Sequence, residues 1–262
     1  MILTTTYTFV TFPRMGIKER RSKVLLAFCL LGGKATESVE IDDIFLKIFD
    51  LSLNQKTKST IQALIKKGAL LKDESKKDAY SLTDVGFVDV SREFPYFRFF
   101  RQEWDGVWRI LSYEIPEKRR ELRDKLRREV SSWGLGPWHR SFWLTPHPII
   151  EDLKSLVSGK EEQQYIQAFE SNHVFGDREV LIEKVWGKVK LHELYKDLFK
   201  QWHDVLSKDM AKLDKFTVIV NSYVNIIRRD PGLPKELLGK SWIGYEALDL
   251  FTEIKSILLS RD

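Results

Sequence analysis

Residues 104–146 read WDGVWRILSYEIPEKRRELRDKLRREVSSWGLGPWHRSFWLTP, and this stretch predicts a strand, a basic helix and a second strand in succession. The alternation of apolar and polar residues over 107–115 is typical of a strand. Pro116 ends this strand and suits the first turn of a helix. The helix carries apolar residues every fourth position, at Leu122, Leu126 and Val130. Gly-rich residues 134–137 then predict a turn into a strand over 140–144.

The chain after this stretch continues with helix and strand patterns. Apolar residues recur at helical spacing over 149–157, and residues 165–169 indicate another strand. Strand, helix, strand, helix and strand in this order predict a ferredoxin-like α+β domain, to which we assign residues 93–175. Its first residues, 93–102, are aromatic and basic; they form either a hinge packed against the next domain or a stacking platform for single-stranded nucleic acid.

The segment before the central domain, residues 18–92, predicts a winged helix-turn-helix domain. Three amphipathic helices are indicated, at residues 19–31, at 38–49 with Ser38 as the cap, and at about 54–68. Two short strands around the charged turn 73–78 follow as a hairpin, and residue 83 opens a fourth helix. Three helices and a hairpin are the elements of a winged helix.

The third helix of this segment would be the recognition helix. Its exposed positions carry residue types that bind phosphates and base edges: Lys56, Lys58, Ser59, Thr60, Gln62, Lys66 and Lys67. Lys76 and Lys77, in the hairpin turn, would contact the phosphate backbone. The same residues also suit the solvated face of a protein-binding winged helix, and the lack of arginine on this helix argues against direct reading of guanine.

The last part of the chain, residues 176–262, predicts a helical C-terminal domain. Amphipathic patterns indicate helices at 191–206, 216–227 and 245–259. The sequence Asp-Pro-Gly-Leu-Pro at 230–234 separates the last two.

Composition narrows the class of protein. The chain has 262 residues, 43% of them hydrophobic, so it is long enough for two or three globular domains. Its net charge of +5 permits nucleic acid as a partner without requiring it. Cys29 is the single cysteine, which favours a reducing, cytoplasmic setting. No apolar run reaches membrane-spanning length, and residues 1–17, read as a short strand or a loose arm, show no signal-peptide pattern.

The sequence offers little for catalysis or for a metal or cofactor. The five histidines lack metal-ligand spacing, and no glycine-rich phosphate loop or nucleophile elbow is present. The central domain does resemble the small ferredoxin-like nucleases of CRISPR adaptation, which carry an aspartate at the end of the first strand. Glu114 stands at that place and is the one metal-binding candidate under this alternative, a metal-dependent nuclease.

Two blocks of sequence resemble the PaaX-type family of transcriptional repressors, named for the regulation of phenylacetic acid degradation. The first block comprises Trp104-Asp105-Gly106, Trp108, Ile115-Pro116-Glu117, Arg120, Leu122-Arg123, Leu126-Arg127, Gly134, Gly136, Ser141, Trp143 and Pro146. The second comprises Arg228-Arg229-Asp230-Pro231, Leu233-Pro234, Leu237-Leu238, Trp242, Gly244 and Ala247. With the winged-helix segment, the resemblance covers nearly the whole chain after residue 17.

From the single cysteine and the lack of catalytic motifs, we predict a cytoplasmic, non-enzymatic protein. The resemblance implies a homodimeric repressor that binds a double-stranded DNA operator. It also implies release by an acyl-CoA effector, such as an aryl-CoA thioester. Arginines that suit phosphates and tryptophans that suit an apolar pocket make five candidate effector residues: Arg109, Arg120, Arg123, Trp143 and Trp242. The basic helix that bears two of these arginines is equally interpreted as a solvated face with i,i+4 ion pairs.

The recognition helix departs from the family's Arg-x-Ala-Leu-x-Arg-Leu pattern. The aligned residues here are Lys58, Thr60, Ile61, Ala63 and Leu64. One family arginine is therefore a lysine and the other an alanine, which predicts a different operator.

Overall fold

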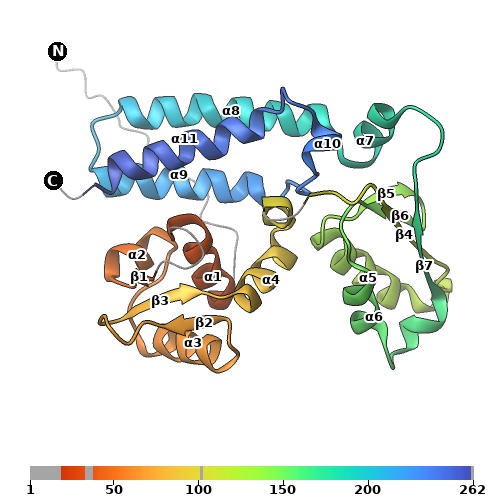
Figure 1. The fold of residues 1–262 in the computed structure, drawn as a ribbon, viewed down its shortest axis with the longest axis horizontal. Coiled ribbons are helices and arrows are strands. Elements are labelled where there is room, and N and C mark those ends of the chain that lie inside the picture. The colour runs from red at the N-terminus through yellow and green to blue at the C-terminus, as the bar shows by residue number, and fades with distance from the viewer. Residues whose placement is uncertain (1–18, 33–37, 101–102, 261–262) are drawn as a thin grey trace, which may run out of the picture.

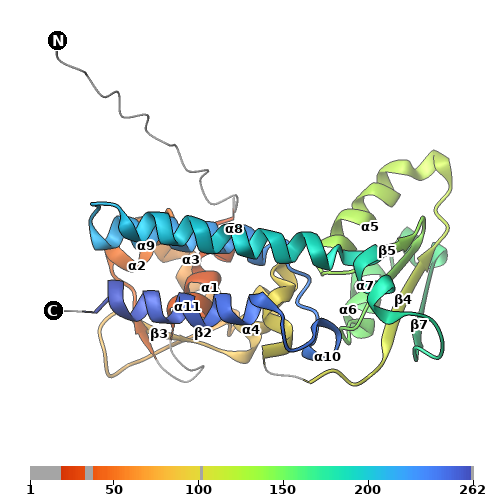
Figure 2. The same cartoon turned by 90° about the horizontal axis from the view of Figure 1, so that it is seen from above.

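The computed structural model describes residues 19–32, 38–100 and 103–260, so the arm or strand expected before residue 18 lies outside the described residues. Long helices of the C-terminal part form one layer (Figure 1). The N-terminal module lies along one side of this layer, and the central sheet domain lies at one end of it. Figure 2 gives the view from above.

The N-terminal module, residues 19–93, combines helices with a small sheet. Its elements are α1 (Arg20–Leu31), β1 (Val39–Glu40), α2 (Asp43–Ile48), α3 (Gln55–Lys66), β2 (Leu70–Lys72), β3 (Ala79–Leu82) and α4 (Asp84–Glu93). The antiparallel sheet has the order β1-β3-β2. One expectation is wrong: Ser38 does not cap α2. Its hydroxyl instead donates to Asp73, 2.6 Å away, and Asp42 caps the helix by accepting from the Phe45 amide at 2.6 Å.

The central domain carries a four-stranded antiparallel sheet of order β5-β6-β4-β7. Its elements are β4 (Trp108–Tyr113), α5 (Arg120–Ser132), β5 (Gly136–His139), β6 (Phe142–Thr145), α6 (Ile150–Val157) and β7 (Ile166–Ser171). The succession β-α-β-β-α-β is that of the ferredoxin-like fold. The prediction of a turn at 134–137 is wrong in part, because residues 136–139 form the strand β5. Pro137 is tolerated there since β5 is an edge strand, with a bulge between Pro137 and His139.

Helices α5 and α6 pack on one face of this sheet and close a second core. The stripe expected on the basic helix is confirmed: Leu126 and Val130 are buried, and Leu122 packs against them. Their partners include Leu111 of β4 and Leu153 of α6. Burial of this stripe explains why a segment with so many arginines folds as a helix on the sheet.

The C-terminal part is helical, as expected. It comprises α7 (Arg178–Trp186), α8 (Lys188–Ser207), α9 (Lys212–Ile227), α10 (Lys235–Leu238) and α11 (Ile243–Leu258). Trp186 of α7 stacks on Trp108 of β4, with ring centres 6.0 Å apart, and ties this part to the sheet. Among the described residues, no helix combines the length and the apolar character needed to cross a membrane.

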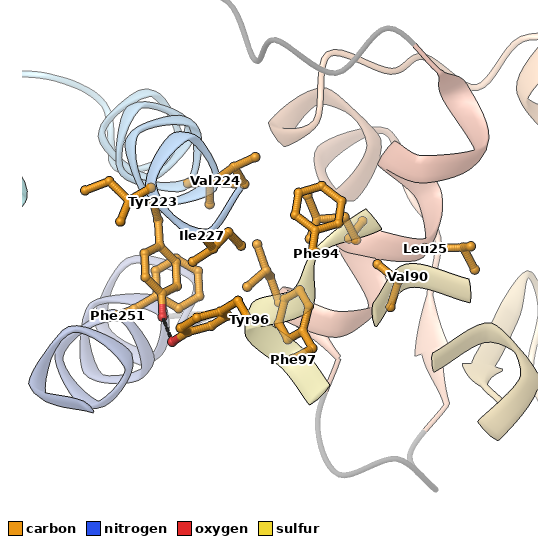
Figure 3. Close-up of a cluster of buried hydrophobic side chains, with 14 of the residues drawn as sticks. Leu25, Val90, Phe94, Tyr96, Phe97, Tyr223, Val224, Ile227 and Phe251 are labelled. Carbon is orange, nitrogen blue, oxygen red and sulfur yellow. Dashed lines mark hydrogen bonds between the residues drawn. The ribbon is translucent and has the colours of Figure 1, made fainter. Parts of the chain in front are cut away.

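The N-terminal module and the C-terminal helices share one hydrophobic core. Figure 3 shows the junction, where Leu25 and Val90 come from the module and Phe251 comes from α11. The short 3-10 helix η1 (Pro95–Phe100) lies between them and inserts Tyr96 and Phe97 into the core. Its described side chains therefore fit the interpretation of 93–102 as a packed hinge.

A buried hydrogen bond joins the two sides of this junction. The hydroxyls of Tyr96 and Tyr223 lie 2.6 Å apart, and both side chains are buried (Figure 3).

We expect Tyr96→Phe alone to destabilise the protein by about 1–3 kcal/mol, because the Tyr223 hydroxyl loses this partner inside the core. The double change to phenylalanine should cost less than the sum of the two single changes. Chemical denaturation of the four proteins measures this, and strictly additive losses would contradict a direct bond.

Candidate nucleic-acid interface and ligand pocket

Helix α3 presents a basic, acid-free face to solvent. The Asn54 side chain caps it by accepting from the Thr57 amide at 3.0 Å. Thr57, Ile61 and Leu64 are buried and hold the helix against the module. No acidic residue occurs between Asp50 and Asp73, so nothing in this segment neutralises its lysines. A surface of this kind attracts phosphate groups.

The predicted contact residues of α3 fall into two groups. Six are exposed: Lys56, Lys58, Ser59, Gln62, Lys66 and Lys67. Thr60 is only partly exposed, and its hydroxyl donates to the Lys56 carbonyl at 2.9 Å. The Lys67 ammonium lies 2.6 Å from the Asp89 carboxylate, which also pairs with Arg21. Lys67 is therefore already partnered within the module, whereas Lys58 and Lys66 have no ion pair with any described residue.

The hairpin between β2 and β3 is mixed in charge. Lys76 and Lys77 are exposed at its turn, as expected. Asp73 organises the turn, since it accepts hydrogen bonds from Ser38, from the Ser75 hydroxyl and from the Ser75 amide. These bonds lower the pKa of Asp73 to about 2, so this carboxylate stays charged. Residues 73–78 hold two lysines and three acidic residues, so the turn, unlike α3, has no net positive charge.

The five candidate effector residues are not gathered in one place. Arg109 is buried on β4, where Asp105 at 2.6 Å and Glu170 at 2.9 Å hold it. Trp143 lies in the core of the central domain and donates to the Tyr113 hydroxyl at 3.2 Å. Trp242, at the start of α11, lines a pocket. Effector binding by the set as a whole stays a prediction.

The basic helix α5 carries several ion pairs. Arg123 lies 2.7 Å from Glu117 and lowers the pKa of that carboxyl. Arg120 lies 3.6 Å from Asp124 in an i,i+4 pair, and Arg119 lies 2.9 Å from Glu161. These contacts are those of a solvated, ion-paired face, the second of the two interpretations of this helix.

A pocket of about 540 Å³ lies where η1, the loop 230–234 and α11 meet. Tyr96, Trp242 and Tyr245 supply aromatic walls, and Asp230 lies among them. Asp230 is 3% exposed, and its carboxylate accepts hydrogen bonds from the Tyr195 hydroxyl at 2.7 Å and from the Gly232 amide at 2.8 Å. Sequence reasoning missed Asp230 as a pocket residue, although it lies in the block Arg228–Pro231 that carries the family resemblance.

The described residues contain no cluster of metal-ligating side chains that would support a metal-dependent nuclease. Glu114 is exposed just after β4, and its amide donates to the Tyr165 carbonyl at 3.0 Å. Within the described ranges, no three histidine, cysteine, aspartate or glutamate side chains are close enough to hold a metal ion together. His147 is fully buried, and its Nε2 lies 2.8 Å from the Pro231 carbonyl oxygen, which is a structural contact.

The fold thus defines an α+β protein with a ferredoxin-like centre and a helical C-terminal part. Comparison with known families gives two matches: the PaaX protein central Cas2-like domain over residues 101–181 and the PaaX-like protein C-terminal domain over residues 186–261. The chain belongs to the PaaX family, which confirms the resemblance drawn from the sequence.

One curated protein and one solved structure are similar to this chain. The Transcriptional repressor PaaX of Escherichia coli (strain K12) is 23% identical over 193 residues, which are 68% of this chain and 60% of that protein. The match therefore spans about 60% of the length of this curated relative. The structure of the Uncharacterized protein Rv0674 from Mycobacterium tuberculosis is similar in fold, with a TM-score of 0.54 and 17% identity. That likeness covers 92% of this chain and 96% of the other.

Proposed function

We propose that the protein is a DNA-binding transcriptional regulator, a repressor, in which residues 19–93 act as a winged helix. The observation that carries the proposal is the exposed, acid-free face of α3. The family relationship to a protein named as a transcriptional repressor supports it. In this proposal the protein is not an enzyme.

The order of elements in the N-terminal module also supports the proposal. Helices α1, α2 and α3 are followed by the antiparallel strands β2 and β3, as a winged helix requires. In this arrangement α3 enters the major groove and the hairpin contacts the adjacent backbone. Lys58 and Lys66 bind phosphates, while Ser59 and Gln62 reach base edges.

Two finer parts of the proposal rest on what the family resemblance implies. The protein acts as a homodimer, so that two copies of α3 read two half-sites one or more helical turns apart. An acyl-CoA thioester, an aryl-CoA in the simplest case, releases it from DNA. Size-exclusion chromatography with light scattering measures the dimer, and a gel-shift titration with phenylacetyl-CoA measures release.

The decisive experiment is a fluorescence-anisotropy titration with DNA from the protein's own promoter. The logarithm of the binding constant should fall linearly with the logarithm of salt concentration, with a slope of roughly −0.9 for each phosphate neutralised. A shuffled duplex of the same composition should bind more weakly. Equal binding to both duplexes, or binding that salt does not weaken, would contradict the proposal.

A further inference from the structure

The pocket between η1 and α11 combines aromatic rings with a buried carboxylate. Tyr96 and Trp242 are 7% and 4% exposed, and Tyr245 is partly buried. The Tyr245 hydroxyl is buried and has no hydrogen-bond partner among the described residues. Aromatic faces carry negative electrostatic potential and attract cations, most strongly where water is excluded.

Asp230 adds a carboxyl group that no described basic residue neutralises; burial raises its pKa, and the hydrogen bonds from Tyr195 and Gly232 counter that shift. Its two hydrogen bonds come from neutral donors, a tyrosine hydroxyl and a backbone amide. In the part of the chain that the structure describes, no lysine, arginine or histidine forms an ion pair with it. A buried carboxylate without a counter-ion is costly, and a cationic ligand beside it reduces that cost.

The rim of the pocket is also acidic. Glu103, Glu236 and Asp249 are exposed around it. Lys235 is the one basic residue among the described lining residues, and its ammonium lies 5.6 Å from the centre of the Tyr245 ring. Burial, followed by the charges of Asp230 and Glu236, raises the pKa of Tyr245 to about 12. The position of Lys235 indicates that this ring already accepts an ammonium group.

We propose that this pocket binds a small organic cation with an apolar or aromatic body. The ammonium group lies beside Asp230, where its N–H groups donate to the carboxylate, and the body packs against Trp242 and Tyr96. The four carboxylates that line the pocket disfavour a phosphate-rich ligand in the same place. The proposal does not depend on DNA binding.

A series of three ligands of one shape and different charge tests the proposal. Phenethylammonium, 2-phenylethanol and phenylacetate are titrated into the full chain by isothermal titration calorimetry, without DNA, at one ionic strength. Phenethylammonium should bind roughly tenfold or more tightly than the neutral alcohol, and phenylacetate more weakly than the alcohol. Equal affinities, a preference for phenylacetate, or no binding of any of the three would overturn the proposal.

Variants of the pocket residues test whether the cation binds beside Asp230. Asp230→Asn should reduce the preference for the cation to about threefold or less, whereas Asp204→Asn, exposed on α8 outside the pocket, should leave it unchanged. Because Asp230 also bonds to Tyr195, circular dichroism must show that this variant folds. If it does not fold, the double variant Glu236→Gln/Asp249→Asn decides, since both residues are exposed. The preference should fall by roughly twofold or more in this rim variant. An undiminished preference in the folded pocket variants would sink the proposal.

Discussion

Replacing Lys58 and Lys66 together by alanine should weaken binding of promoter DNA by about 1–3 kcal/mol, or roughly 5- to 150-fold. Both lysines are exposed on α3, and neither forms an ion pair with a described residue, so both ammonium groups are available to phosphates. The variant should also show a shallower salt dependence, by roughly one unit for each phosphate contact removed. Fluorescence anisotropy at several salt concentrations measures both quantities.

The chain offers a matched control for this change. Lys196 and Lys200 lie on α8, across the C-terminal layer from α3 (Figure 1). Their replacement by alanine removes the same two positive charges, although each of them, unlike the two α3 lysines, lies in an ion pair with a neighbouring carboxylate. That control should keep nearly full affinity. A second comparison uses neighbours on α3: Lys66→Ala should weaken binding more than Lys67→Ala, because Asp89 already holds Lys67. Equal losses in the α3 and α8 variants would mean that only overall charge matters and that α3 is not the reading helix.

Gly232→Ala should destabilise the protein by about 3–5 kcal/mol and lower its melting temperature by roughly 10 °C. Gly232 has φ of +63°, and a Cβ atom there would lie 2.2 Å from the Pro95 carbonyl oxygen. The obstacle is backbone, so no side-chain rotation relieves it. The loop 230–234 and η1 would have to separate, and the Tyr96–Tyr223 bond crosses the same junction.

Gly239→Ala separates the two causes of this loss. Gly239 has a similar φ of +81°, but a Cβ atom there meets nothing within 4 Å. The backbone of Gly239, with φ of +81° and ψ of 170°, lies in a region that only glycine adopts readily, so the control carries a backbone cost of about 1–3 kcal/mol without the contact. Differential scanning calorimetry of both variants measures the difference. Equal losses would show that η1 does not depend on close approach to the loop.

Local patterns in the sequence predicted most of the helices and most strands, because each buries one face of its own. The stripe Leu122, Leu126 and Val130 is an example, whereas the hairpin of β2 and β3 was predicted from two short apolar runs around a charged turn. The strand β5 was missed because its glycine and proline indicate a turn, and only pairing with β6 makes it a strand. The cap of α2 was misplaced because Ser38 bonds to Asp73, which lies 35 residues away in sequence.

The candidate interface was easier to predict than the pocket. The lysines of α3 lie on a single helix, and the apolar residues of that helix identify its buried side. Helical spacing therefore predicts that the lysines are exposed. The pocket brings together Tyr96, Asp230 and Tyr245 from three separated segments, and their meeting depends on how η1 packs. Charge alone also failed to show that Arg109 is buried between two carboxylates.

The shared core has a consequence for dissecting this protein. Sequence order suggests that the N-terminal module could be detached after residue 92, yet Leu25, Val90 and Phe94 pack in one cluster with Val224 and Ile227 of α9 (Figure 3). Cutting there would leave apolar surface open to water on both fragments. The module is therefore a poor cassette for fusion to other proteins. A minimal fragment for crystallography or domain exchange would retain the two ends of the chain together and shorten only the sheet domain inserted between them.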